Sequence, residues 1–162
     1  MSSADKNLDL HSDRNLINLE KHKLGIVVSE WNEEVTDKLK EGALEALREY
    51  GAKNENIRVI QVPGSYELTL GAQWLAEMAA VEAVICLGCV IQGETRHFDF
   101  ICSAVAQGIM DLNIKSDKPI IFGVLTTENQ QQALDRAGGA HGNKGYEAGI
   151  TAIKMLGVKA GL

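Results

Sequence analysis

The sequence predicts an α/β fold: a parallel sheet between two layers of helices, forming a three-layer α/β/α sandwich. Short apolar runs alternate four times with segments whose apolar residues recur at helical spacing. Such strand–helix rounds give parallel strands joined by right-handed crossovers. Because no repeat or linker interrupts the pattern, residues 23–162 are expected to form one domain behind an N-terminal arm of residues 1–22.

The composition is that of an ordinary globular protein. The chain has 162 residues, of which 45% are hydrophobic and 23% charged, and a formal net charge of −6. The acidic balance argues against a nucleic-acid partner, because such proteins usually present a basic face. No apolar stretch reaches the roughly 20 residues that a membrane span needs, and the N-terminus lacks the apolar core of a signal peptide. We therefore expect a cytoplasmic protein with no membrane partner.

The elements follow from apolar spacing, taken in chain order. Residues 24–28 form a branched apolar run, typical of a strand buried on both faces. The amphipathic helix after it is expected to start at Asn32 as N-cap and to end at Gly51. A short edge strand at 16–19 is an additional possibility. The remaining predicted strands are 57–62, 83–91 and 119–125, and the remaining helices are 66–78, 97–112, 128–137 and 143–156, with a loop at 138–142.

The predicted topology indicates where a ligand would bind. In open parallel sheets, ligands bind beyond the carboxyl ends of the strands. The segments at that edge are 29–32, 63–67, 88–97 and 125–129.

Two near-motifs at this edge do not support the chemistry that they first suggest. Cys86 and Cys89 have CxxC spacing, but residues three apart in a strand point to opposite faces. Buried apolar cysteines are therefore favoured over a redox or metal pair. The run from Gly88 resembles a phosphate-binding P-loop, except that Glu94 stands where the lysine is required. An ATPase is excluded, although the helix start that follows can still hold a phosphate.

Three side chains are candidates for a site, and each also has a purely structural interpretation. His97 lies at a helix start, and an imidazole exchanges protons near neutral pH, but it could equally be a hydrated surface residue. Trp31 could stack on a flat heterocycle or plug the core. Arg136 could bind phosphate or interact with the end of its helix.

Several segments together resemble the 6,7-dimethyl-8-ribityllumazine synthases of riboflavin biosynthesis. The likeness spans about residues 24–155 and rests on ordered motifs at matching spacing. These are VPGSYE from Val62, GETRHFDF from Gly93, FGVLTT from Phe122, QALDRAG from Gln132 and HGNKG from His141.

The resemblance implies a flavodoxin-like fold with a four-stranded parallel sheet that the arm can extend. It implies a transferase that condenses 5-amino-6-(D-ribitylamino)uracil with 3,4-dihydroxy-2-butanone 4-phosphate and releases phosphate and water. No metal or organic cofactor is implied. A flavin- or lumazine-binding carrier without catalysis stays open as the alternative. An FMN electron carrier is less favoured, because no phosphate loop follows the first strand.

The resemblance also implies residue roles. His97 matches the proton donor and acceptor. Glu94, Thr95 and Arg136 match the phosphate site, with Lys144 as a helper at the same end. The groups that hold the pyrimidine ring and ribityl chain are Trp31, Ser65, Tyr66, Glu67, Cys89, Val90, Ile91 and Phe122.

Family members assemble as homopentamers with sites between subunits, and some close into icosahedral shells. The short loop at 138–142 favours a shell here, and the resemblance adds riboflavin synthase as a partner.

Two positions depart from the usual pattern. Trp31 stands where phenylalanine is common, and its larger ring should still stack and could strengthen flavin binding. Glu94 stands where a small residue is common, and would lower substrate affinity only if its side chain faced the phosphate.

Overall fold

A computed structural model describes residues 15–162 of the chain. The part of the N-terminal arm at residues 1–14 lies outside the described residues. The edge strand expected at 16–19 does not form. Instead Leu19 is completely buried, and its backbone N–H donates to the Tyr50 carbonyl over 2.7 Å. This segment is therefore packed against the end of the first helix rather than paired with the sheet.

The centre of the molecule is a parallel sheet of four strands. The strands are β1 (Leu24–Ser29), β2 (Ile57–Val62), β3 (Ala83–Ile91) and β4 (Ile120–Thr127). Their order is β2-β1-β3-β4, and every neighbouring pair is parallel. β1 is buried along its whole length, as its apolar sequence predicts.

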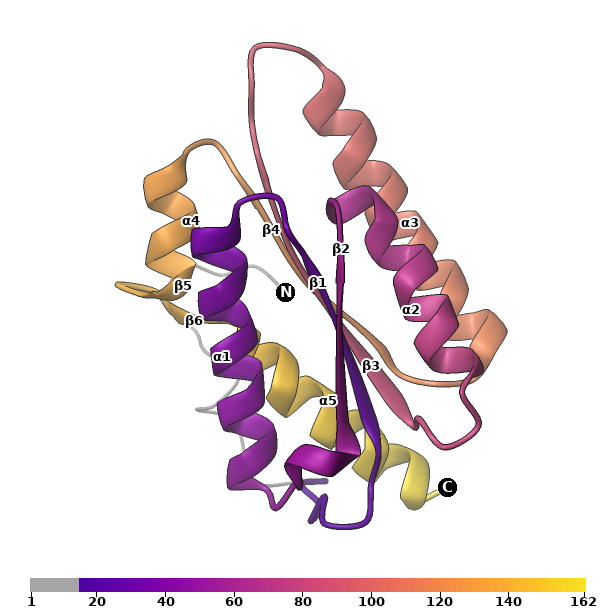
Figure 1. The fold of residues 1–162 in the computed structure, drawn as a ribbon. Coiled ribbons are helices and arrows are strands. Elements are labelled where there is room, and N and C mark those ends of the chain that lie inside the picture. Colours follow the sequence, from indigo (N-terminus) through magenta and orange to yellow (C-terminus); the bar gives the residue numbers. More distant parts are fainter. Residues whose placement is uncertain (1–14) are drawn as a thin grey trace.

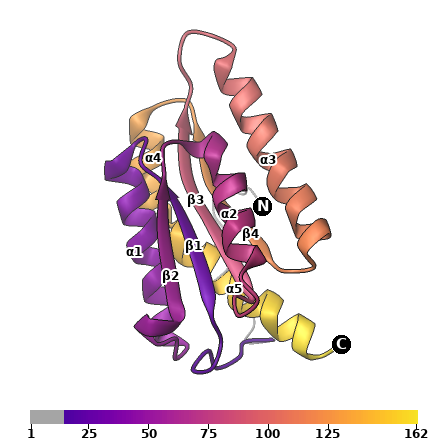
Figure 2. The ribbon, with the colours of Figure 1, turned by 45° about the vertical axis from the view of Figure 1, so that its right-hand side comes forward.

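Helices cover both faces of this sheet (Figures 1 and 2). On one face lie α1 (Glu33–Glu49), α4 (Gln130–Arg136) and α5 (Lys144–Ala160), and on the other lie α2 (Leu68–Glu77) and α3 (His97–Ser116). Each layer of helices packs on its own apolar core. Successive residues along a strand point alternately into one core and the other. The α/β sandwich predicted from the sequence is thus confirmed.

Several boundaries differ from the sequence-based expectation. α3 continues to Ser116, and in its last turn the Asn113 and Ser116 side chains donate hydrogen bonds to the carbonyls of Ile109 and Leu112. Asp117, with a φ of 51°, ends the helix. α5 continues to Ala160. The loop expected at 138–142 is partly a small antiparallel pair, β5 (Ala137–Gly139) with β6 (Gly142–Asn143), because Gly138 and Gly142 adopt positive φ.

Short 3-10 turns and helix ends complete the fold. One turn, η2 (Asn54–Asn56), precedes β2, and another, η3 (Ser65–Glu67), replaces the start expected for the α2 helix. Gly51 follows α1 with a φ of 89°, which fits its predicted role in ending that helix. Asn32 stands at the N-cap position of α1, but its side chain makes no capping hydrogen bond, contrary to the prediction.

Candidate functional site

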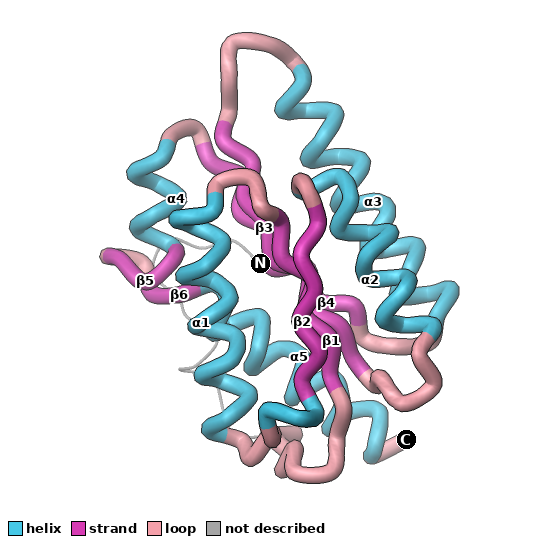
Figure 3. Tube along the Cα trace, viewed as in Figure 1, coloured by secondary structure: helices cyan, strands magenta, loops and turns pink. Residues whose placement is uncertain are grey.

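A cleft of about 770 Å³ lies beyond the carboxyl ends of β1, β2 and β3. The connecting segments that form it come together at the top of the view in Figure 3. They are the β1–α1 loop, the segment from β2 through η3, and the segment from β3 to the start of α3. The cleft is lined by Trp31, Pro63, Gly64, Ser65, Tyr66, Glu67, Cys89, Val90, Ile91, Gly93, Thr95, His97, Phe98 and Ile101.

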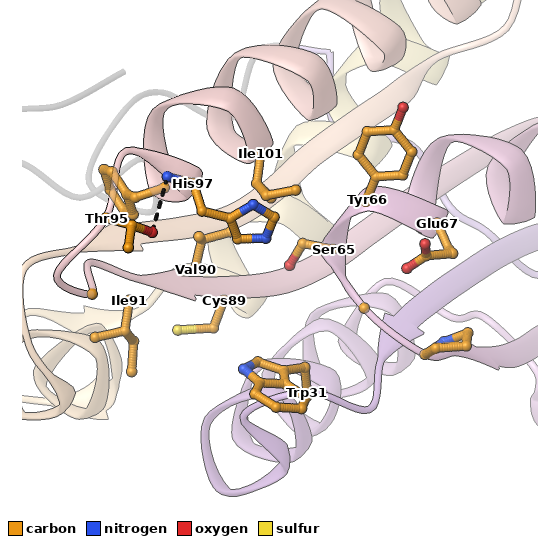
Figure 4. Close-up of a pocket in the computed structure, with 14 residues that line it drawn as sticks. Trp31, Ser65, Tyr66, Glu67, Cys89, Val90, Ile91, Thr95, His97 and Ile101 are labelled. Carbon is orange, nitrogen blue, oxygen red and sulfur yellow. Dashed lines mark hydrogen bonds between the residues drawn. The ribbon is translucent and has the colours of Figure 1, made fainter.

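Most of the side chains predicted to hold the ring and ribityl chain lie in this cleft. Figure 4 shows Trp31 on one side, His97 and Ile101 on the other, and Cys89 and Val90 between them. Three separate connections of the fold are needed to bring these residues together. The arrangement combines an apolar floor with an exposed aromatic wall, which suits a flat organic ring.

Trp31 is the aromatic wall, and the structure excludes its interpretation as a core plug. Its side chain is 72% exposed. Its backbone is nevertheless held, because its N–H donates to the Pro63 carbonyl over 3.2 Å. An indole that is fixed at its backbone and open at its ring is available to stack on a ligand.

Ser65 supplies a polar group that nothing in the described chain satisfies. It is only 6% exposed, yet its hydroxyl has no hydrogen-bond partner among residues 15–162. Buried hydroxyls normally have partners, since leaving one unpaired costs about 1–3 kcal/mol. Because Ser65 also lines the cleft, a bound ligand can complete its hydrogen bonding.

His97 is the first residue of α3, and its ring projects into the cleft (Figure 4). Its backbone N–H lies 3.4 Å from the Thr95 hydroxyl, which joins the helix start to the preceding loop. The side chain is exposed, so the imidazole can reach both solvent and a ligand. Geometry therefore allows proton exchange with a bound molecule.

Four of the predicted site residues do not line the cleft of the single chain. Phe122 lies on β4 and is 43% exposed, and Glu94 is exposed in the loop before α3. Arg136 ends α4, where its guanidinium donates to the Gln132 carbonyl over 3.0 Å. Lys144 forms an ion pair with Glu147 at the start of α5. Of the residues that the resemblance implies for the phosphate site, only Thr95 lines the cleft within one chain.

Some lining residues were not predicted individually. Pro63, Gly64 and Gly93 belong to segments that the strand-end rule had identified. Phe98 and Ile101 follow His97 on α3, and Ile101 lies one helical turn after it. That spacing of four residues is the signal from which Ile101 could have been found.

The cysteines are packing residues. Cys86 and Cys89 belong to the two different core clusters, so they point to opposite faces of β3 as their spacing predicts. Burial raises the pKa of each thiol to about 12, which keeps both protonated at neutral pH. Neither is therefore a thiolate nucleophile.

Two further features of residues 15–162 concern metals and membranes. No three His, Cys, Asp or Glu side chains gather there in a way that could hold a metal ion. No helix of that same part is long and apolar enough to cross a membrane.

Comparison with known proteins places this geometry in one family. The family model described as 6,7-dimethyl-8-ribityllumazine synthase matches residues 21–160. A protein of that name from Cytophaga hutchinsonii is 64% identical, over 96% of this chain and 98% of its own. Proteins of the same name from Parabacteroides distasonis and Phocaeicola vulgatus are 52% and 50% identical over 99% and 98% of this chain, and over 100% and 95% of their own. The chain therefore belongs to the 6,7-dimethyl-8-ribityllumazine synthase family.

Proposed function

We propose that this protein condenses 5-amino-6-(D-ribitylamino)uracil with 3,4-dihydroxy-2-butanone 4-phosphate to give 6,7-dimethyl-8-ribityllumazine, inorganic phosphate and water. The observation that carries the proposal is the cleft, in which Trp31, Ser65 and His97 come from three separate segments and face one space (Figure 4). The family membership and the full-length similarity to curated synthases support the same reaction.

The pyrimidine substrate is proposed to bind against β3. Its flat ring would lie between the Trp31 indole and the apolar floor of Cys89, Val90 and Ile91. The unpartnered Ser65 hydroxyl would hydrogen-bond to a polar edge of the ring. Tyr66 and Glu67, from η3, would meet the ribityl chain, because a carboxylate accepts hydrogen bonds from sugar hydroxyls.

The phosphate is proposed to bind at the start of α3, opposite a residue from a second copy of the chain. Thr95 lines the cleft at the start of α3, a helix of 20 residues whose N-terminal end favours an anion. Arg136 would approach from the second copy and add a planar cation. Glu94 is exposed and does not line the cleft of one chain, so its carboxylate need not face the phosphate. Lys144 would assist at the same end.

The chemistry needs positioning and proton transfer. The pyrimidine amine attacks the ketone carbonyl, and loss of water gives an imine. Phosphate then leaves as the neighbouring carbon gives up a proton, and the resulting enol becomes a ketone. The ribitylamino nitrogen closes the ring on that ketone with loss of a second water. His97 would carry protons between these groups, because its ring faces the cleft and remains accessible to solvent.

A second copy is also supported by the surface. Large apolar side chains are exposed along α2 and α3, and such exposure marks protein interfaces. They are Leu70, Trp74, Met78, Phe100, Met110 and Ile114. β2 forms an edge of the described sheet, with Arg58 and Val59 exposed. An arm strand from a neighbour could pair there.

The proposed assembly is a homopentamer in which Phe122, Arg136 and Lys144 of one chain complete the cleft of the next. Closure of such pentamers into an icosahedral shell is the larger form that we propose. A cytoplasmic location, and riboflavin synthase as the partner that consumes the product, belong to the same proposal. The mass in solution distinguishes monomer, pentamer and shell.

The test is an assay of the purified protein with both substrates, following the lumazine chromophore and the release of phosphate. Both signals should appear well above the uncatalysed background. The non-catalytic carrier predicts instead tight flavin or lumazine binding with no turnover. That result would reject the proposed synthase activity for this chain. The names of its relatives favour the synthase over the carrier.

A further inference from the structure

β3 extends beyond the strand that it pairs with on one side. The register between β1 and β3 ends at Val28 and Leu87. Further along, Cys89 is paired only with Leu125 of β4. At this point the Asn32 side chain donates a hydrogen bond from Nδ2 to the Cys89 carbonyl over 2.9 Å. The amide therefore continues the hydrogen bonding between the first and third strands after β1 itself has ended.

The backbone of Asn32 is as unusual as its side chain. Its φ of 63° and ψ of 45° lie in the left-handed region, which asparagine and glycine tolerate better than other residues. Its carbonyl accepts from the N–H groups of Val35 and Thr36, over 2.9 and 3.1 Å, and so starts α1. The side chain is then free to turn toward β3 instead of capping the helix.

These contacts tie the Trp31 segment to two strands at once. On the β2 side, Glu30 N–H donates to the Val62 carbonyl over 2.8 Å and Trp31 N–H to the Pro63 carbonyl over 3.2 Å. On the β3 side, the Asn32 amide joins the Trp31 segment to the Cys89 carbonyl. Trp31 and Cys89 both line the cleft, and Figure 4 shows them facing the same space.

We propose that Asn32 is a positioning residue that sets the spacing between the Trp31 indole and the β3 floor, and thereby the affinity for the pyrimidine substrate. The inference rests on the proposed function, since it assumes that a flat ring occupies this space. Asn32 contributes a left-handed bend and a hydrogen-bond bridge, and substitution can separate the two. Asn32→Gly keeps the bend and removes the bridge. Asn32→Asp keeps a tolerated bend but sets a carboxylate against the Cys89 carbonyl.

The experiment measures both Michaelis constants, kcat, thermal unfolding and assembly mass for these variants. Asn32→Gly should raise the KM for the pyrimidine about tenfold, as expected for one lost hydrogen bond, and leave the KM for the phosphorylated ketone unchanged. Asn32→Asp should raise the pyrimidine KM further. The matched control is Asn56→Gly, which removes a similar amide bridge of 3.1 Å to the Glu20 carbonyl, away from the cleft, and should change neither KM.

A pyrimidine KM for Asn32→Gly within about twofold of the wild type would overturn the proposal. So would a uniform loss of activity that follows the loss of folded protein, because that indicates a structural role only. Calorimetric binding of the pyrimidine alone needs no turnover, so it tests Asn32 even if the wild type proves inactive. If Asn32→Gly does not fold, Asn32→Asp tests the bridge in its place, and a pyrimidine affinity within about twofold of the wild type would then overturn the proposal.

Discussion

Gly88 packs closely against Ser65: a Cβ added at Gly88 would stand 2.7 Å from Ser65 Oγ and 2.8 Å from Leu68 Cδ1. Real Cβ atoms are essentially never that close to another heavy atom. The glycine in the middle of β3 therefore makes room for η3, and with it for the one buried hydroxyl of residues 15–162 that is left unpaired.

This relationship predicts the effect of Gly88→Ala. The added methyl should displace Ser65 and Leu68, destabilise the fold by about 1–3 kcal/mol and weaken pyrimidine binding. Thermal unfolding and pyrimidine calorimetry check both effects. Gly161→Ala is the control, because a Cβ there makes only ordinary contacts of 3.6 Å or more. Unchanged pyrimidine binding in Gly88→Ala would show that the Ser65 hydroxyl does not contact the ring.

His97→Ala tests the proton-transfer role. Positioned acid–base groups contribute about a hundredfold or more to rate, so kcat should fall about a hundredfold while pyrimidine binding stays close to that of the wild type. Steady-state kinetics and calorimetry separate the two quantities. His22→Ala is the control, because His22 pairs with Glu82 outside the cleft. If His97→Ala lost binding and kept its turnover, His97 would be a ligand-holding residue and not a proton carrier.

Trp31 allows a graded test of stacking. Trp31→Ala should weaken pyrimidine binding by about 1–3 kcal/mol, which is the usual contribution of an aromatic ring stacked on a base. Trp31→Phe should retain most of the affinity, since a smaller aromatic face remains. Because the side chain is 72% exposed in the single chain, neither change should lower the stability of the fold. Equal affinities for the alanine variant and the wild type would place the ring elsewhere.

The buried thiols predict how stability depends on alkaline pH. The pKa of Cys86 is raised by burial from 9.0 to about 12 in the folded chain. Its contribution to stability is therefore fully present below pH 9.0 and is lost as the pH rises toward 12. The free energy of unfolding should fall in that range by about 1.4 kcal/mol per pH unit for this thiol, in addition to other groups.

Cys86→Ala should remove this part of the slope, whatever it does to absolute stability. Denaturant unfolding at several pH values between 9 and 11 measures it. An identical slope in the variant and the wild type would mean that the thiol ionises as readily in the folded chain as in the unfolded chain.

The fold was predictable from the sequence because its signals are local. Strand-length apolar runs and helical spacing located β1 to β4 and the large helices, and the strand-end rule identified the segments that form the cleft. The spacing of Cys86 and Cys89 correctly separated them to two faces. Boundaries were less accurate, because the β5–β6 pair depends on positive φ values at Gly138 and Gly142, and the last turn of α3 involves side-chain hydrogen bonds of Asn113 and Ser116.

The site was predictable to a smaller extent. A position next to a strand end indicates that Trp31 or His97 can face a ligand, but their roles came from the family resemblance. The bridge from Asn32 to Cys89 was missed, because an asparagine at a helix start is normally assigned as a cap. Arg136 and Phe122 do not line the cleft of one chain, so neither their spacing nor the fold of a single copy can place them in the site.

In the proposed site, the His97 cleft of one chain is completed by Arg136 of a second. Co-expression of His97→Ala with Arg136→Ala chains tests it directly, at a low concentration of the phosphorylated ketone where each variant alone is nearly inactive. With equal random mixing, about a quarter of the shared sites contain both wild-type residues, so about a quarter of wild-type activity should return. Activity no higher than that of the separate variants would mean that Arg136 does not act in the cleft of a neighbouring chain.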